Sequence, residues 1–533
     1  MHPVEAILVL LVAAAALAFA ATRMGVPYAL LLVVGGLGLG FVPGLPTVTL
    51  EPEYVFVLFL PPLLYYAAMQ TSWRDFRANI RPILTLAFGL TLFTTFAVAA
   101  IVHWLIPEFT WSIAIVLGAI VSPPDAVAAT AVAQRLGVPK RIITILEGES
   151  LINDAAALVV YRIAVATVVS ASLVEPGYVA LRFLWAPVGG VAIGLLVGMA
   201  VSWLRPKVHD ASVEIALSLL TPYIAYLPAE HLGSSSVLAV VTAGLYVARR
   251  IPQIVTPSAR LRAYAVWDAV VFILNCLVFI LIGLQLPDIL AHLRGEMSIR
   301  LLIAYGALVS VATVVVRIAW VFTATIAARW IPWVRRNEPM PPIGQVFVVA
   351  WTGMRGIVSL AAALALAENF PHRELILFLT FCVILTTLLA QGLTLPWIIR
   401  RLHVHEDGDQ DREEEVMARY LSALAAIERL DALTAPHPTA TPTAEPVNPA
   451  AVARVRAEYE HRIGYYSARL ANPSAVEDEA AEHACCTVED AQREAIAAER
   501  RMLLRLRDDG VIGDEILRRV QHALDLEESQ LDA

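Results

Sequence analysis

Residues 147–154 read Glu-Gly-Glu-Ser-Leu-Ile-Asn-Asp, and this polar stretch lies inside an otherwise apolar run that extends from residue 141 to residue 170. An ionisable side chain at membrane depth is costly, so such residues usually serve a function. Two more charged residues lie in other apolar runs. Asp125 follows Ser122-Pro123-Pro124 in one of them, and Arg355 lies in another. The pattern therefore indicates a protein that carries ions across a membrane.

The composition of the chain is that of a membrane protein. Its 533 residues are 58% hydrophobic and only 16% charged, with a mean hydropathy of +0.68. A helix needs about 20 residues to span the hydrocarbon core of a bilayer. We therefore expect an all-α membrane domain over residues 1–402, with about thirteen transmembrane helices. The apolar runs that predict them are 4–22, 26–42, 51–70, 80–106, 111–135, 141–170, 178–204, 211–227, 234–248, 264–285, 299–330, 342–367 and 373–402.

The distribution of basic residues predicts how these helices are oriented. If the thirteen runs alternate in direction, eighteen Arg and Lys residues fall in one set of loops and four in the other. Cytoplasmic loops are the ones enriched in Arg and Lys. We therefore expect a multi-pass protein of the cell (inner) membrane, with its N-terminus outside and its C-terminus in the cytoplasm. No basic segment precedes the first run, so we expect an uncleaved helix there and not a signal peptide.

Beyond residue 402 the composition changes abruptly. Residues 403–533 contain 28 Asp and Glu, 14 Arg and no Lys. We expect this segment to be a soluble, acidic and helical cytosolic tail, with a Pro/Thr-rich linker at 435–449. Helical stretches are expected near residues 451–471, 485–508 and 513–530.

Three charged residues are expected at a similar depth in the membrane. With a rise of about 1.5 Å per residue, Asp125, Asp154 and Arg355 each lie roughly 20 Å along their helices. The whole bilayer is about 40–45 Å thick, so all three lie near its middle. The sequence therefore predicts one site that brings these three residues together.

Two of the helices should be interrupted at this depth. The adjacent Pro123 and Pro124 remove amide donors and clash with the preceding turn, and Gly353 and Gly356 weaken the helix around Arg355. Interrupted helices at corresponding positions of two halves indicate the binding site of a transporter. We expect these two broken helices to cross at the midplane, one in each of two inverted repeats.

The polar residues around the breaks are suitable ligands for a small cation, which prefers oxygen. Asp125, Asp154, the Ser150 hydroxyl and the Asn153 amide could supply such oxygens, together with carbonyls freed by the break. Ser150 and Asp154 are four residues apart on a helix and hence lie on one face.

Each of these residues also has a structural interpretation. The aspartates could be buried partners of Arg355, Arg162 or Arg317, and for Glu149 we favour the structural role, as the partner of Arg355. The run of glycines between residues 35 and 40 is interpreted as a surface for close helix packing.

Five motifs in this chain resemble the monovalent cation:proton antiporter-1 family, which includes NhaP and the animal sodium/proton exchangers. They occur in the family's order across residues 1–402. The motifs are Leu60-Pro61-Pro62, Ser122-Pro123-Pro124-Asp125, Glu147-Gly148-Glu149-Ser150, Asn153-Asp154 and Gly353-Met354-Arg355-Gly356.

The resemblance implies a homodimeric antiporter that works by alternating access and contributes to pH homeostasis. It implies that Asp154 and Asp125 carry the cation or protons, that Ser150 and Asn153 support the site, and that Glu149 pairs with Arg355. Asn153 before Asp154 resembles the electroneutral members. Sodium is the expected cation and potassium the alternative.

The chain departs from the family at two positions. Members often have a carboxylate at the position of Tyr66 and threonine at that of Pro124. A cation channel is a further alternative. An intramembrane aspartyl protease is disfavoured, because neither aspartate lies in a Tyr-Asp or Gly-x-Gly-Asp motif. We expect no enzymatic activity, no cofactor and no nucleic-acid partner.

Overall fold

The computed structural model describes the two parts of the chain as separate compact units, Met1–Glu406 and Asp407–Ala533. The described residues are 3–24, 28–41, 55–170, 176–208, 210–255, 257–293, 297–337, 340–405, 416–417, 420–428, 431 and 449–471. Over these residues the secondary structure is helical and no strand is found.

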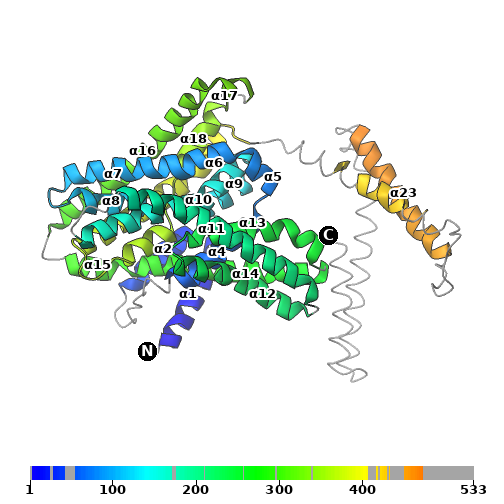
Figure 1. Ribbon diagram of the computed structural model, residues 1–533, viewed down its shortest axis with the longest axis horizontal. Coiled ribbons are helices and arrows are strands. Elements are labelled where there is room, and N and C mark those ends of the chain that lie inside the picture. Colours follow the sequence, from blue (N-terminus) through cyan, green and yellow to red (C-terminus); the bar gives the residue numbers. More distant parts are fainter. Residues whose placement is uncertain are drawn as a thin grey trace. The chain divides into compact units, whose positions relative to one another are not determined.

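The helices of the first unit follow one another closely along the chain (Figure 1). Up to residue 170 they are α1 (Pro3–Met24), α2 (Tyr28–Gly40), η1 (Val55–Phe59), α4 (Leu60–Gln70), α5 (Trp73–Ala78), α6 (Ile80–Leu84), η2 (Thr85–Leu90), α7 (Thr91–Leu105), α8 (Trp111–Val121), α9 (Val127–Arg135) and α10 (Lys140–Ser170). The others are α11 (Pro176–Leu204), η3 (Arg205–Lys207), α12 (Ala211–His231), α13 (Ser236–Ile254), α14 (Pro257–Leu284), α15 (Leu286–Leu293), α16 (Ile299–Ala327), η4 (Ala328–Trp330), α17 (Pro332–Asn337), α18 (Ile343–Trp351), α19 (Ile357–Leu364), α20 (Arg373–Thr386), η5 (Thr387–Gln391) and α21 (Gly392–Arg401).

The all-helical membrane fold expected from the apolar runs is confirmed, since every one of those runs contains at least one helix. Seven helices in the described ranges are long and apolar enough to cross a membrane, and several shorter apolar helices accompany them. The count of thirteen spans stays a prediction.

Side-chain caps begin several of the long helices where the sequence places Ser or Thr. The hydroxyls of Thr110, Ser235 and Ser298 accept hydrogen bonds from backbone amides in the first turns of α8, α13 and α16. These residue types satisfy amides that have no partner inside the helix. The caps therefore fix where α8, the first half of one broken helix, begins.

Two glycines allow α2 and α14 to approach each other closely. A Cβ on Gly36 would overlap the carbonyl oxygen of Ile280, and a Cβ on Gly283 would overlap that of Val33. Small residues at helix contacts are typical of membrane proteins. The expected role of the glycine run is thus found at Gly36, whereas Gly38 has open space around it.

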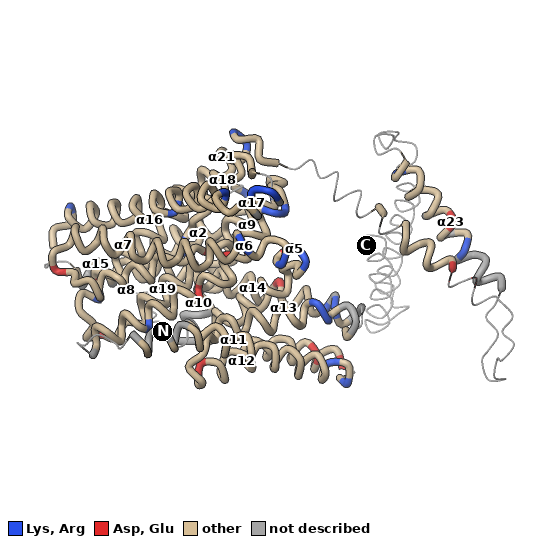
Figure 2. The backbone as a smooth tube through the Cα atoms, turned by 45° about the horizontal axis from the view of Figure 1, so that its top comes forward, with Lys and Arg blue, Asp and Glu red and all other residues tan. Residues whose placement is uncertain are grey.

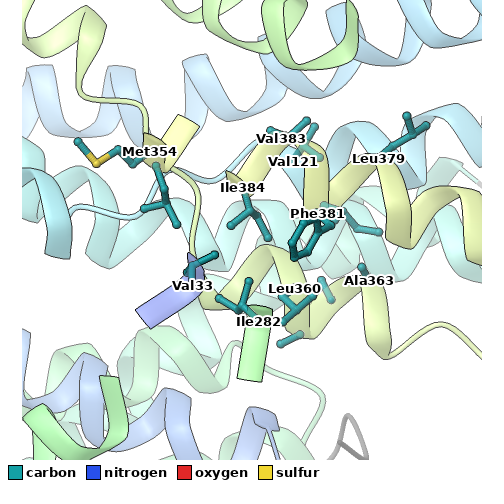
Figure 3. Close-up of a cluster of buried hydrophobic side chains, with 14 of the residues drawn as sticks. Val33, Val121, Ile282, Met354, Leu360, Ala363, Leu379, Phe381, Val383 and Ile384 are labelled. Atoms are coloured by element: carbon teal, nitrogen blue, oxygen red, sulfur yellow. The ribbon is translucent and has the colours of Figure 1, made fainter. Parts of the chain in front are cut away.

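The largest hydrophobic cluster of the described residues includes α18 and α19, the two halves of one broken helix. In Figure 3, Leu360 and Ala363 of α19 lie near Phe381 and Ile384 of α20 and near Ile282 of α14. All five side chains are buried. This packing holds the short helix α19 in place although it has only eight residues.

Basic residues gather at one end of the first unit, which we call the basic end. Figure 2 shows Lys and Arg on α5, on α17 and at the end of α21. These residues are Arg74, Arg77, Arg335, Arg336, Arg400 and Arg401. The last turn of α9, which contacts α21, adds Arg135.

In the second unit, residues 420–428 are helical and α23 covers Pro449–Ala471, where the sequence predicts a helix. Arg456 on α23 forms ion pairs with Glu460 and Asp431. The helices expected near 485–508 and 513–530, and residues 435–448 of the expected linker, lie outside the described residues.

Candidate ion-binding site

Two broken helices meet at the centre of the site. The first consists of α8 and α9, which are separated by residues 122–126, and the second of α18 and α19, separated by residues 352–356. The backbone amide of Asp125 donates a hydrogen bond of 2.7 Å to the carbonyl oxygen of Met354. The breaks predicted from the prolines and the glycines are therefore both present and in direct contact.

Asp125 lies at the amino ends of both second halves. Its Oδ1 accepts a hydrogen bond of 2.9 Å from the amide of Val127, the first residue of α9. Its Oδ2 lies so close to Gly356, at the start of α19, that a Cβ there would overlap it. Helix amino ends carry partial positive charge. The backbone of two half-helices therefore stabilises a carboxylate at this position.

Arginines occupy the carboxyl ends of the two first halves. Arg355 Nη1 donates 2.6 Å to the carbonyl of Ser122, just after α8, and Arg317 Nη2 donates 3.1 Å to the carbonyl of Val349 near the end of α18. Carbonyls at the end of a helix have no partner within it and carry partial negative charge. A guanidinium group donates hydrogen bonds to these carbonyls, and its positive charge offsets their partial negative charge.

The expectation that Glu149 pairs with Arg355 was wrong. Glu149 forms a two-pronged ion pair with Arg317 of α16, with N–O distances of 2.6 and 3.0 Å. Both side chains are 1% exposed. Arg355 instead points to the end of α8, where the unpaired carbonyl of Ser122 requires a donor.

Asp154, Ser150 and Asp125 line one cavity of about 340 Å³. Asp154 is 5% exposed, and its carboxylate makes no hydrogen bond with any residue that the structure describes. A buried carboxylate that faces a cavity without a partner is suited to bind a cation or a proton from that cavity.

Ser150 and Asn153 contribute in different ways. The Ser150 hydroxyl faces the cavity and accepts a hydrogen bond of 3.4 Å from the Ala126 amide. Asn153 is fully buried and does not line the cavity, and its Nδ2 donates 2.9 Å to the carbonyl of Pro124. Asn153 was expected among the ligands. It is not among the residues that line the cavity, and its amide nitrogen supports the backbone of the first break.

The cavity extends from the breaks towards the basic end. Of its exposed lining residues, Ala67 and Gln70 lie in the last turns of α4 and Gln134 lies in the last turn of α9, next to the basic loops. The other two, Val127 and Ala131, lie nearer the break. The site can therefore be reached from that end in this conformation.

Glu147 and Tyr66 also line the cavity, and the sequence did not predict them as ligands. Glu147 is partly buried and accepts 3.4 Å from Gln134 Nε2. The hydroxyl of Tyr66, where the family often has a carboxylate, donates to Asp268 and accepts 2.9 Å from Gln70 Nε2. Glu147 and Asp268 are charged residues within apolar runs, and this was the feature of the sequence that could have indicated them.

The shape of the site predicts a strong effect of Gly356→Ala. The added methyl group should push the Asp125 carboxylate out of position and reduce exchange on the order of tenfold or more, which corresponds to about 1.4 kcal/mol. Exchange in proteoliposomes checks this, with Gly38→Ala as the control because no atom lies within 4 Å of a Cβ there. Equal activity of the two variants would contradict the placement of Asp125.

The chain is similar to known sodium/proton exchangers in sequence and in fold. The family model described as "Sodium/hydrogen exchanger, transmembrane" matches residues 7–401. The chain is 37% identical over 518 residues to an uncharacterised Na⁺/H⁺ exchanger of Mycobacterium tuberculosis, covering 96% of this chain and 92% of that one. It is 33% identical over 417 residues to the low-affinity Na⁺/H⁺ antiporter NhaS1 of Synechocystis, covering 76% of each.

A third relative is a sodium, potassium, lithium and rubidium/H⁺ antiporter of Bacillus pumilus. It is 34% identical over 367 residues, covering 66% of this chain and 54% of that one. Among solved structures, the sodium proton antiporter MjNhaP1 from Methanocaldococcus jannaschii has the same fold, with a TM-score of 0.60 at 17% identity. The match covers 75% of this chain and 99% of that one.

Proposed function

The chain belongs to the sodium/hydrogen exchanger family and exchanges a monovalent cation for protons across a membrane, and we propose that Asp125 and Asp154 carry both ions in turn. It is a secondary transporter and not an enzyme. The shared cavity of Asp125, Asp154 and Ser150 is the observation that carries this proposal. A cation and a proton each neutralise the same carboxylates, so the binding of one excludes the other.

We propose exchange of one cation for one proton, as the resemblance implies. Around the crossing, Arg317 and Arg355 face Glu149 and the two aspartates, and Glu147 adds a fourth carboxylate to the ion cavity. A sodium ion and a proton carry the same charge. When each occupies the site alone, both loaded forms therefore cross the membrane with the same net charge.

The direction of access follows from the basic end. We assign this end to the cytoplasm, because cytoplasmic loops are enriched in Arg and Lys. The N-terminus then lies outside, and the described conformation is open to the cytoplasm. Alternating access requires a second conformation in which the same two aspartates face the outside.

Sodium is the proposed cation and potassium the alternative, since one relative is named for sodium, potassium, lithium and rubidium. Proton movement in proteoliposomes, driven in turn by gradients of each cation, tests this. Sodium-driven movement without net current supports the proposal, and a preference for potassium changes the cation. A cation current without proton coupling would make the protein a channel.

The family resemblance also leads us to propose a homodimer in the cell membrane. Cross-linking of the protein in native membranes measures this. A single cross-linked species of twice the monomer mass is the expected result, and only monomers would contradict it.

The acidic tail is proposed to regulate transport. The lining residues of the ion cavity and both breaks belong to the first unit, Met1–Glu406. Truncation after residue 405 should leave exchange intact while changing its pH dependence or turnover. Loss of exchange at every pH in a truncated protein that inserts normally would contradict this prediction.

A further inference from the structure

A second cavity, of about 170 Å³, lies near the basic end and shares no lining residue with the ion cavity. It is enclosed by residues of α6, η2, the start of α10, the end of α16, η4, α17 and α18. Nothing in the exchange mechanism uses it.

This cavity has a cationic rim and an apolar interior. Arg81, Arg141 and Arg329 contribute three guanidinium groups. Arg141 donates through Nε to Asn79 Oδ1 at 3.1 Å, a bond that does not use its two terminal nitrogens. The interior is apolar and includes Leu86, Ile145, Val321 and Val349.

The elements around the cavity expose apolar side chains. Leu84 of α6, Ile326 of α16 and Ile343 of α18 are 40%, 53% and 71% exposed, and Trp330 of η4 is 83% exposed. Exposed tryptophans and apolar residues beside arginines are typical of the membrane interface. The cavity therefore lies where the headgroup of a lipid and the start of its acyl chains would be found.

The interior wall adjoins the buried ion pair. Ile145 is one helical turn from Glu149 on α10, and Val321 is one turn from Arg317 on α16. Val349 of α18 provides the carbonyl that Arg317 binds. A molecule in the cavity would thus pack against α10 and α16, which the Glu149–Arg317 pair joins, and against α18, whose Val349 carbonyl Arg317 binds.

We propose that this cavity binds an anionic phospholipid, whose phosphate contacts the three arginines and whose acyl chain fills the apolar interior. Basic pockets between transmembrane helices are suited to such headgroups. Free phosphate would leave the apolar wall uncovered, and an uncharged lipid would bring no negative charge to the three arginines. The bound lipid stabilises the junction of α10, α16 and α18.

Thermal unfolding of the full-length protein in detergent tests this proposal. After delipidation, phosphatidylglycerol should raise the unfolding temperature by several degrees, whereas phosphatidylcholine and free glycerol phosphate should not. The double variant Arg81→Gln/Arg141→Gln should lose most of the shift. The control Arg77→Gln, an exposed arginine outside the cavity, should keep it.

A second variant tests the apolar part independently. Ala324→Phe fills the interior without removing a charge, and it should also lose the phosphatidylglycerol shift. An unchanged shift in either the arginine variant or Ala324→Phe would overturn the proposal. So would an equal shift with glycerol phosphate or phosphatidylcholine, or no shift in the unmodified protein.

Discussion

Asp154→Asn is expected to abolish cation–proton exchange while the protein remains folded and inserted. Asparagine has nearly the same shape as aspartate but cannot take up a proton or supply a negative charge. Asp154 lines the ion cavity, is 5% exposed and has no hydrogen-bond partner among the described residues, so the change breaks no hydrogen bond that the structure describes. Exchange in proteoliposomes and the thermal unfolding temperature measure the two effects separately.

Asp210→Asn is the matched control for this experiment. Asp210 caps α12 through the amides of Ser212 and Val213, far along the chain from the cavity residues. Asparagine caps a helix as well as aspartate does, so exchange should be normal. Transport by Asp154→Asn at the rate of the unmodified protein would contradict the role of Asp154.

Arg317→Met should cause the largest loss of stability among single changes at the site. It removes one partner of a buried ion pair and leaves Glu149 charged and uncompensated, which costs about 3–5 kcal/mol. Arg355→Met removes a charged donor to the Ser122 carbonyl, a loss of about 1.5–3 kcal/mol. In the same detergent, the unfolding temperature of Arg317→Met should therefore be lower than that of Arg355→Met.

The double variant Glu149→Gln/Arg317→Met isolates the pair. With both charges removed, no buried charge remains unpaired, so the loss should be smaller than that of Arg317→Met alone. A double-mutant cycle of Glu149 with Arg355 should show weaker coupling than the cycle with Arg317. Stronger coupling of Glu149 to Arg355 than to Arg317 would instead support the Glu149–Arg355 pair that the sequence suggested.

The sequence was sufficient to predict the two breaks and the closeness of the two aspartates, which line one cavity. Adjacent prolines must interrupt a helix wherever they occur, and carboxylates inside apolar runs are visible without a structure. The rise per residue then placed both aspartates at one depth. These inferences are local, and they did not depend on how the helices pack.

The partners of the arginines depend on the rotation of each helix about its axis, which the sequence does not determine. Arg355 lies in a non-helical segment, where no periodicity predicts its direction. Arg317 lies on a continuous helix 168 residues away from Glu149 along the chain. Only the packing of α16 against α10 and α18 brings Arg317 to Glu149.

The sequence contained an indication that Asn153 does not line the cavity. Ser150 and Asp154 are four residues apart and face the cavity, while Glu149 and Asn153 are also four apart and face the buried side. A helix turns by about 100° per residue. This periodicity separates Asn153 from Asp154 and groups it with the structural Glu149.

We propose that a cation and a proton compete for the carboxylates of Asp125 and Asp154. Proton release on sodium binding tests it most directly, with purified protein in a weakly buffered solution containing a pH indicator. We expect release approaching one proton per bound sodium ion when the site is protonated, and none from Asp154→Asn. Sodium binding without proton release at every pH would contradict it.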